Sequence, residues 1–231
     1  MIKRLQTLGI VLALIGLGFL VGAGVAFTKV QAGYDSLQAF SAAQNVELTY
    51  DEDGQLTDRG ETQGAEAITA LLTEDWKYPV VESDLDPNDP LVNTASEFMY
   101  QMATISYHTL NGTQTVVLDE DVEYNGEVFK AGSYDFSIDG RYWTGFDREH
   151  PIEGAARDLA WSGTAHGLIG ELGVGTVTHS ALQMGLALSG ILAAFGLTII
   201  LAGLGLVWAG RAKSKRTAEP AVGRTAEPVK V

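Results

Sequence analysis

Two acidic clusters are the residues of this chain whose types and spacing could do chemistry. One occupies residues 84–89 and contains Asp84, Asp86 and Asp89; the other occupies residues 51–53. Hard oxygen ligands on a loop suit calcium, so we take Asp84, Asp86 and Asp89 as a candidate calcium site. Neither cluster has the spacing of an EF-hand calcium loop, which ends on a bidentate glutamate. Turns that carry solvated charge are the alternative interpretation of these residues, and the one we favour.

The histidines give no zinc motif. None of His108, His150, His166 and His179 lies in a His-Glu-x-x-His pattern or within one helical turn of another. A metal-dependent enzyme would use His108, His150 or His166 in a site that is assembled by folding. The sequence also lacks a nucleophile elbow, a phosphate-binding loop and a dinucleotide fingerprint. Without cysteine the chain has no thiolate nucleophile, cysteine-ligated cluster or disulfide. We therefore predict no catalytic residue and no bound cofactor other than calcium.

Two long uncharged apolar runs flank the middle of the chain and must position the residues that it carries. They cover residues 8–27 and 181–209. Each has the roughly 20 apolar residues that cross a hydrocarbon core, and a backbone in lipid must form its own hydrogen bonds. Both runs are therefore predicted to be transmembrane helices. The first run, followed by the small residues of 30–32, also resembles a signal peptide, but it exceeds the roughly 7–15 residues of a signal core, which favours an uncleaved anchor.

The charge distribution predicts the orientation in a plasma membrane. Residues 29–180 hold seven of the 15 basic and 27 of the 29 acidic residues, a net charge of −20. The basic residues outside this range flank the two spans, and cytoplasmic flanks carry the excess of Lys and Arg. We expect residues 1–7 and a disordered basic tail over 210–231 to be cytoplasmic, and an acidic domain over 28–180 to be extracytoplasmic. Such a domain repels nucleic acid.

The middle domain is predicted to be α+β, with short helices and an antiparallel β-meander. Turn dipeptides at 111–112, 125–126 and 139–140 separate β-rich runs, which indicates about four to six strands. Capping residues at 58–61 and 94–97 predict helix starts. Pro151 suits the first turn of another helix. The glycines of 163–175 indicate a tight linker or a close-packed segment beside the membrane.

Small residues repeat at helical spacing within both predicted spans. They are Gly18 and Gly22 in the first, and Gly185, Ser189 and Ala193 in the second. Such residues let helices approach closely, so we expect contact between the two spans or with a homo-oligomer or other membrane proteins. The general abundance of Gly and Ala in membrane spans explains them as well. Neither span contains an ionisable residue, which argues against a pump or a self-contained channel.

Several stretches resemble a group of small actinobacterial two-span membrane proteins of unknown function. They are 56–60, 75–80, 86–92, 97–104 and 107–110. The resemblance implies two end spans around an outer domain. Members often carry an aromatic-ring-opening dioxygenase label, but this sequence has no evident iron site of two histidines and a carboxylate. The group supplies no functional residues to transfer.

These observations favour a non-catalytic envelope protein that lies in the lipid bilayer and binds a partner or assembles through its outer domain or spans. An extracytoplasmic ligand or calcium sensor is the alternative, and a metal-dependent enzyme is the third hypothesis.

Overall fold

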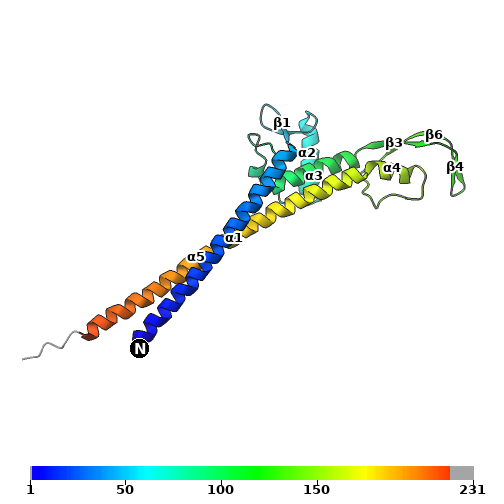
Figure 1. Ribbon diagram of the computed structural model, residues 1–231. Helices are drawn as coiled ribbons and strands as arrows, with labels where there is room; N and C mark the ends of the chain where they lie inside the picture. The colour runs from blue at the N-terminus through cyan, green and yellow to red at the C-terminus, as the bar shows by residue number, and fades with distance from the viewer. Residues whose placement is uncertain (1, 219–231) are drawn as a thin grey trace, which may run out of the picture. The chain divides into compact units, whose positions relative to one another are not determined.

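The computed structural model describes the backbone of residues 2–218 and the side chains of residues 3–211. The chain forms two units, one from residues 1–33 and 182–231, and one from residues 34–181. We call them the paired-helix unit and the mixed unit. Helix α1 (Ile2–Gln44) and helix α5 (Gly163–Ala218) each contribute to both. They are drawn in blue and from yellow to red (Figure 1).

The two helices extend beyond the predicted spans. The ranges 8–27 and 181–209 lie inside α1 and α5. Helix α5 continues through 210–218, where we predicted disorder, and the rest of the predicted tail lies outside the described residues. Extending an existing helix avoids the cost of nucleation, and Lys and Arg are favourable near a helix C-terminus.

The paired-helix unit is built on small residues that recur every seven positions. In α1 the buried residues are Gly9, Gly16 and Ala23, and in α5 they are Ser189, Gly196, Gly203 and Gly210. A seven-residue repeat keeps one seam of each helix facing its partner, as in a coiled coil. Because the residues on this seam are small, the backbones come very close, as small residues permit between membrane helices.

Glycine is required at the closest points of this seam. A Cβ added to Gly203 would lie 2.5 Å from the carbonyl oxygen of Gly9, and one added to Gly16 would lie 2.6 Å from the carbonyl oxygen of Gly196. The predicted residue Gly185 also belongs to this contact, since its Cβ would lie 2.7 Å from Cγ2 of Val30. At Gly203 and Gly16, where the neighbouring atom is backbone, no side chain larger than hydrogen fits without separating the helices, whereas at Gly185 the Val30 side chain would have to move.

The mixed unit contains short helices and short antiparallel strands. Its helices, besides the parts of α1 and α5, are α2 (Thr62–Ala70), the π-helix η1 (Leu71–Asp75), the 3₁₀ helix η2 (Glu82–Asp84), α3 (Ala95–Leu110) and α4 (Glu153–Ala160). Its strands are β1 (Thr49–Tyr50), β2 (Leu56–Thr57), β3 (Thr113–Leu118), β4 (Val122–Tyr124), β5 (Glu127–Phe129) and β6 (Gly132–Ser137). The predicted α+β class with an antiparallel strand region is confirmed.

The strands form separate pairs instead of one meander. Within the described residues the ladders are β1–β2, β3–β6 and β4–β5, each antiparallel. Asn125 and Gly126 have positive φ and form the two-residue turn between β4 and β5, as predicted. The β4–β5 hairpin therefore lies in the connection between β3 and β6, which pair over their full length.

The strand and turn predicted over residues 105–112 are wrong, and one of the two alternatives for residues 163–175 is excluded. The β-rich run over 105–110 is the last part of α3, because the capping box of Thr94 and Glu97 starts a helix that local β propensity does not end. Asn111 is then the C-cap of α3 instead of a hairpin turn. The glycine-rich stretch 163–175 is the first part of α5 instead of a linker.

Two glycines of this stretch, Gly173 and Gly175, lie against α3. A Cβ on Gly175 would lie 2.8 Å from the ring of Phe98, and one on Gly173 would lie 3.5 Å from Cε of Met102. The backbone N–H of Ala95 donates to Nδ1 of His179 at 3.2 Å. As the residue numbers rise along α3 from Ala95 to Met102, those of the contacting residues fall along α5 from His179 to Gly173. The two helices are therefore antiparallel here. The close-packed alternative for these glycines agrees with this contact.

The core of the mixed unit lies on the other faces of α3. Ile68 and Leu72, from α2 and η1, are fully buried. A second cluster gathers Leu110, Ile138 and Trp161 with the partly buried rings beside them. The apolar residues of α3 therefore hold both α2 and the segment that follows β6.

We predict that Gly203→Val lowers the melting temperature of the purified protein by about 5 °C, because the added side chain meets the Gly9 carbonyl. Gly205→Val is the matched control: it makes the same change in the same helix, with nothing within 4 Å of its Cβ. Circular dichroism of both variants in lipid nanodiscs measures the difference. Equal shifts for the two variants would contradict the seam.

Candidate functional site: an apolar cavity in the mixed unit

The three aspartates of the candidate calcium site lie at the end of η2 and in the turn after it. Both the N–H and the side-chain amide of Asn88 donate to Oδ1 of Asp86, at 2.8 and 2.9 Å, and these bonds lower the pKa of Asp86. Asp86 and Asp89 face each other in an isolated antiparallel bridge. Among the described residues, no group of three His, Asp or Glu side chains is placed to hold a metal ion. Calcium binding by Asp84, Asp86 and Asp89 stays a prediction.

Each histidine is engaged by a different structural partner. His108 pairs with Asp58 at 2.9 Å, and Nδ1 of His150 accepts the N–H groups of Ile152 and Glu153 at the start of α4. His166 packs against Trp143. A site that combines these histidines therefore has no support in this geometry.

The predicted packing residues fall into two groups. Ser189 is 5 % exposed and lies on the close seam with Gly185. Gly18 and Gly22 have open space beyond them and line a shallow depression with Phe19. Ala193 is half-buried. The expected contact of Gly18 and Gly22 with a helix of another chain stays a prediction.

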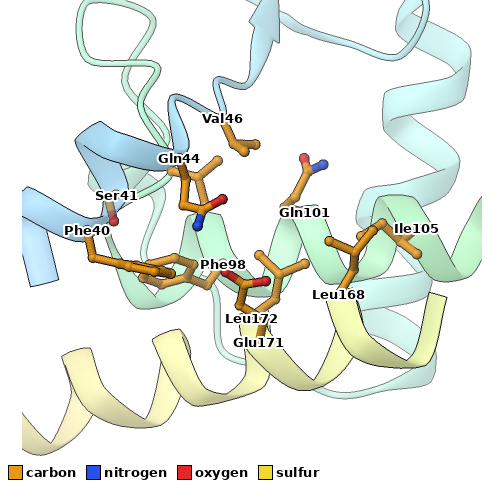
Figure 2. A pocket seen from close by; sticks show the side chains of 11 residues that line it. Phe40, Ser41, Gln44, Val46, Phe98, Gln101, Ile105, Leu168, Glu171 and Leu172 are labelled. Atoms are coloured by element: carbon orange, nitrogen blue, oxygen red, sulfur yellow. The ribbon is translucent and has the colours of Figure 1, made fainter. Parts of the chain in front are cut away.

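The clearest binding feature is an apolar cavity of about 270 Å³ in the mixed unit. The end of α1, the segment around Val46 and Val92, α3 and the start of α5 all contribute to it. Its apolar lining is Phe40, Val46, Val92, Phe98, Ile105, Leu168 and Leu172. Figure 2 labels all of these side chains except Val92 and shows them converging from the separate elements.

Local structure fixes each wall of this cavity. The backbone N–H of Leu48 donates to Pro90 and that of Val92 donates to Val46, so an antiparallel bridge holds Val46 beside Val92. Phe98 is 5 % exposed and cannot leave its position against Gly175 without opening the α3–α5 contact. Phe40 and Val46 are 46 % and 36 % exposed, so the cavity opens to its surroundings on their side.

Four polar side chains reach the cavity. They are Ser41, Gln44, Gln101 and Glu171 (Figure 2). Ser41 is 2 % exposed, and its Oγ has no hydrogen-bond partner. A buried hydroxyl without a partner is costly, so a polar atom of a ligand would stabilise it. Gln44 and Glu171 are exposed, whereas Gln101 is half-buried.

The start of α3 beneath the cavity depends on a buried carboxyl group. Glu97 is 2 % exposed, and its Oε2 accepts the N–H of Asn93 at 3.0 Å and both the N–H and the hydroxyl of Thr94 at 2.8 Å. Burial raises the pKa of Glu97, although these hydrogen bonds act in the opposite direction. The reciprocal bond from the Glu97 N–H to Thr94 completes the capping box and sets the position of Phe98.

Comparisons with known proteins give no relative: no protein-family model matches the chain, and neither the curated proteins nor the solved structures contain a match.

The sequence indicated some of the residues that line the apolar cavity, but it did not indicate that they lie together. Phe40 and Phe98 belong to apolar patterns that predict helical faces, but nothing in the spacing says that the two faces meet. The seven-residue repeat of small residues was visible in both spans and would have located the seam. The predicted packing residues are spaced by four instead.

We predict that Glu97 makes stability depend on pH. Because its folded pKa is raised, the stabilisation it confers is complete below its ordinary value of 4.5 and is lost as pH rises through the folded pKa. Glu97→Gln keeps one oxygen acceptor and stays neutral, so the advantage of the wild type over this variant should shrink as the pH rises from 4.5 through the raised folded pKa. Urea unfolding in nanodiscs measures both free energies.

Glu97→Ala is the control for hydrogen bonding, since it removes all three acceptor contacts at any pH. It should lower the free energy of unfolding by about 1–3 kcal/mol. A constant difference between the wild type and Glu97→Gln across this range would contradict the assignment.

Proposed function

We propose that this chain is an integral membrane protein with both termini in the cytoplasm, and that its extracytoplasmic mixed unit binds the apolar chain of an amphipathic ligand without catalysing a reaction. The membrane assignment is supported by two helices that are long and apolar enough to cross a bilayer, over Lys3–Gln44 and Gly163–Arg211. Only 11 % of the most apolar window of each is buried.

Exposed apolar side chains support a lipid environment. Leu14 is 63 % exposed, Leu201 60 % and Trp208 73 %. Proteins in water rarely leave continuous apolar surfaces of this kind uncovered. The hydrocarbon of a bilayer would cover these side chains at no cost in free energy. They are not used in the contact between the two helices, because the glycine seam makes that contact.

The orientation is supported by the basic residues outside the mixed unit. Lys3 and Arg4 precede the first span, and Arg211 follows the second. Basic flanks favour the cytoplasmic side. The mixed unit would then be outside, with the net charge of −20 that residues 29–180 carry.

The cavity of about 270 Å³ is the observation that carries the proposed binding function. It lies near the lower end of the roughly 300–1,000 Å³ of ligand pockets, and it has the same character: mostly apolar walls with a few polar groups. This size suits one unbranched hydrocarbon chain better than a bulky ring system. The orphan Ser41 hydroxyl and the two glutamines would meet the polar end of such a ligand.

Glu171 determines which polar end is favoured. Its carboxylate is the only charged group among the residues that line the cavity. It attracts an amine and repels a carboxylate, by the modest amount that an exposed charge allows. We therefore expect a neutral or cationic head group.

A non-catalytic role is supported by the partners of the histidines. Each candidate is used to cap a helix, pair with a carboxylate or pack against a ring. A sensor could use the same cavity, with the ligand altering the α3–α5 contact, and partner binding through the mixed unit would be compatible with either.

We predict the orientation by single thiols, since the chain has no cysteine. Val128→Cys, at a residue 50 % exposed on β5, should react with a membrane-impermeant maleimide on intact cells. Lys3→Cys should react only after the cells are permeabilised. The reverse pattern would overturn the orientation.

We predict that a photoreactive dodecylamine carrying a diazirine labels the peptides that contain Phe98 and Leu172 when the protein is in nanodiscs. The neutral alcohol analogue should label less and the dodecanoate analogue least, because of Glu171. Leu172→Trp fills the cavity and should lower this labelling about tenfold. Peptide mass spectrometry measures the labelling.

Val177→Trp is the matched control, since it places the same ring on α5 at a residue that is 68 % exposed and does not line the cavity. Glu171→Gln should remove the preference for the amine. Labelling that Leu172→Trp leaves unchanged would show that the probe reports the bilayer and not the cavity.

A further inference from the structure

Three of the four tryptophans of this chain line a second cavity in the mixed unit. They are Trp76 after η1, Trp143 in the segment after β6, and Trp161 at the end of α4. Tyr142 and His166 complete the aromatic lining, and the cavity volume is about 410 Å³. This aromatic cavity is separate in its lining residues from the apolar cavity described above.

Hydrogen bonds hold the rings of the aromatic cavity in place. The indole N–H of Trp76 donates to the Tyr142 hydroxyl at 2.9 Å, and that of Trp161 donates to the backbone carbonyl of Arg141 at 3.1 Å. The Tyr142 and Trp161 rings are stacked, with centroids 5.7 Å apart and 23° between planes. The ring faces are thus arranged before a ligand arrives, which limits the entropy lost on binding.

The neutral polar groups of the cavity can serve a ligand with hydroxyl groups. Because the Tyr142 oxygen accepts from Trp76, its own proton is available for donation. Nδ1 of His166 lies 3.2 Å from the carbonyl of Ser162, which can only accept. In the neutral tautomer that donates this bond from Nδ1, Nε2 can accept a hydrogen bond from a ligand. Thr144 adds an exposed hydroxyl.

The charges around the cavity favour a neutral ligand over a cationic one. None of the described residues that line it carries a carboxylate. The guanidinium of Arg157 lies 3.8 Å from the centre of the Trp143 ring, and that of Arg148 lies 5.9 Å away. Arg157 also pairs with Asp158 at 2.7 Å, so its charge is balanced, but its guanidinium already covers the Trp143 ring and a cationic ligand would have to compete with it for that ring. An aromatic cage for a quaternary ammonium group would need ring faces that no guanidinium covers and a carboxylate in its lining.

We propose that the aromatic cavity binds a neutral sugar ring. The C–H face of a pyranose would lie on the aromatic rings, and its hydroxyl groups would bond to Tyr142, Thr144 and His166. Tyr142 is 46 % exposed above Trp161, which is 5 % exposed, so the ring that a sugar reaches first is supported from beneath. The volume lies within the range of ligand pockets.

The test uses the full chain in nanodiscs of phosphatidylcholine, which contain no sugar. Glucose-, N-acetylglucosamine- and mannose-based hexasaccharides are titrated while tryptophan fluorescence is recorded. At least one should give a saturable change, and Tyr142→Ala should weaken its binding about tenfold. Tyr142→Phe keeps the ring and loses the hydroxyl, so it should lie between the two. Trp208→Phe removes the remaining tryptophan, which does not line the cavity, and should leave the affinity unchanged.

Two results would overturn this proposal. One is a saturable response to tetramethylammonium in place of the sugars, and the other is no saturable response to any of the three hexasaccharides. Saturation transfer NMR on the wild type and Tyr142→Phe gives a second readout, since it shows directly whether sugar C–H protons lie against the protein. Leu172→Trp should leave sugar binding intact, so failure here is distinguishable from failure of the apolar-chain proposal.

Discussion

The contact between Phe98 and Gly175 is the constraint on which the mixed unit depends. An aromatic ring can lie against the α5 backbone only because Gly175 has no Cβ. Neighbouring residues of α3 beyond this contact face two different cavities. Gln101 and Ile105 line the apolar cavity, whereas Met102 and Ser106 line the aromatic one. Two cavities of different chemistry thus share one helix pair as their common wall.

The polar chemistry of this region follows from how α3 begins. Glu97 accepts the N–H groups of Asn93 and Thr94, the two residues that precede the helix, from inside the fold, at the cost of burying a carboxyl group. That cost is met by three hydrogen bonds to one oxygen, which is why the carboxyl can remain next to Phe98. The acidic loop over 84–89 uses Asp86 for its own amide contacts.

The sequence predicted the elements that local chemistry determines. The two apolar runs, the capping box at Thr94 and the turn at 125–126 depend on residues within a few positions, and the structure has helices and a hairpin there. The sequence could not predict how distant segments meet. Residues 105–110 have strand propensity and are helical because packing against α5 and the core prevails. Both cavities join residues far apart in sequence, and no pattern encodes that.

The glycine seam also limits how the two long helices can move. A sliding displacement along their axis would bring side chains larger than hydrogen against the carbonyl groups that now meet Gly203 and Gly16. The next register with the same fit lies one repeat away, roughly 10 Å along the helix. The two helices therefore resist sliding along each other. A conformational change in the pair would have to twist the helices about each other or separate them.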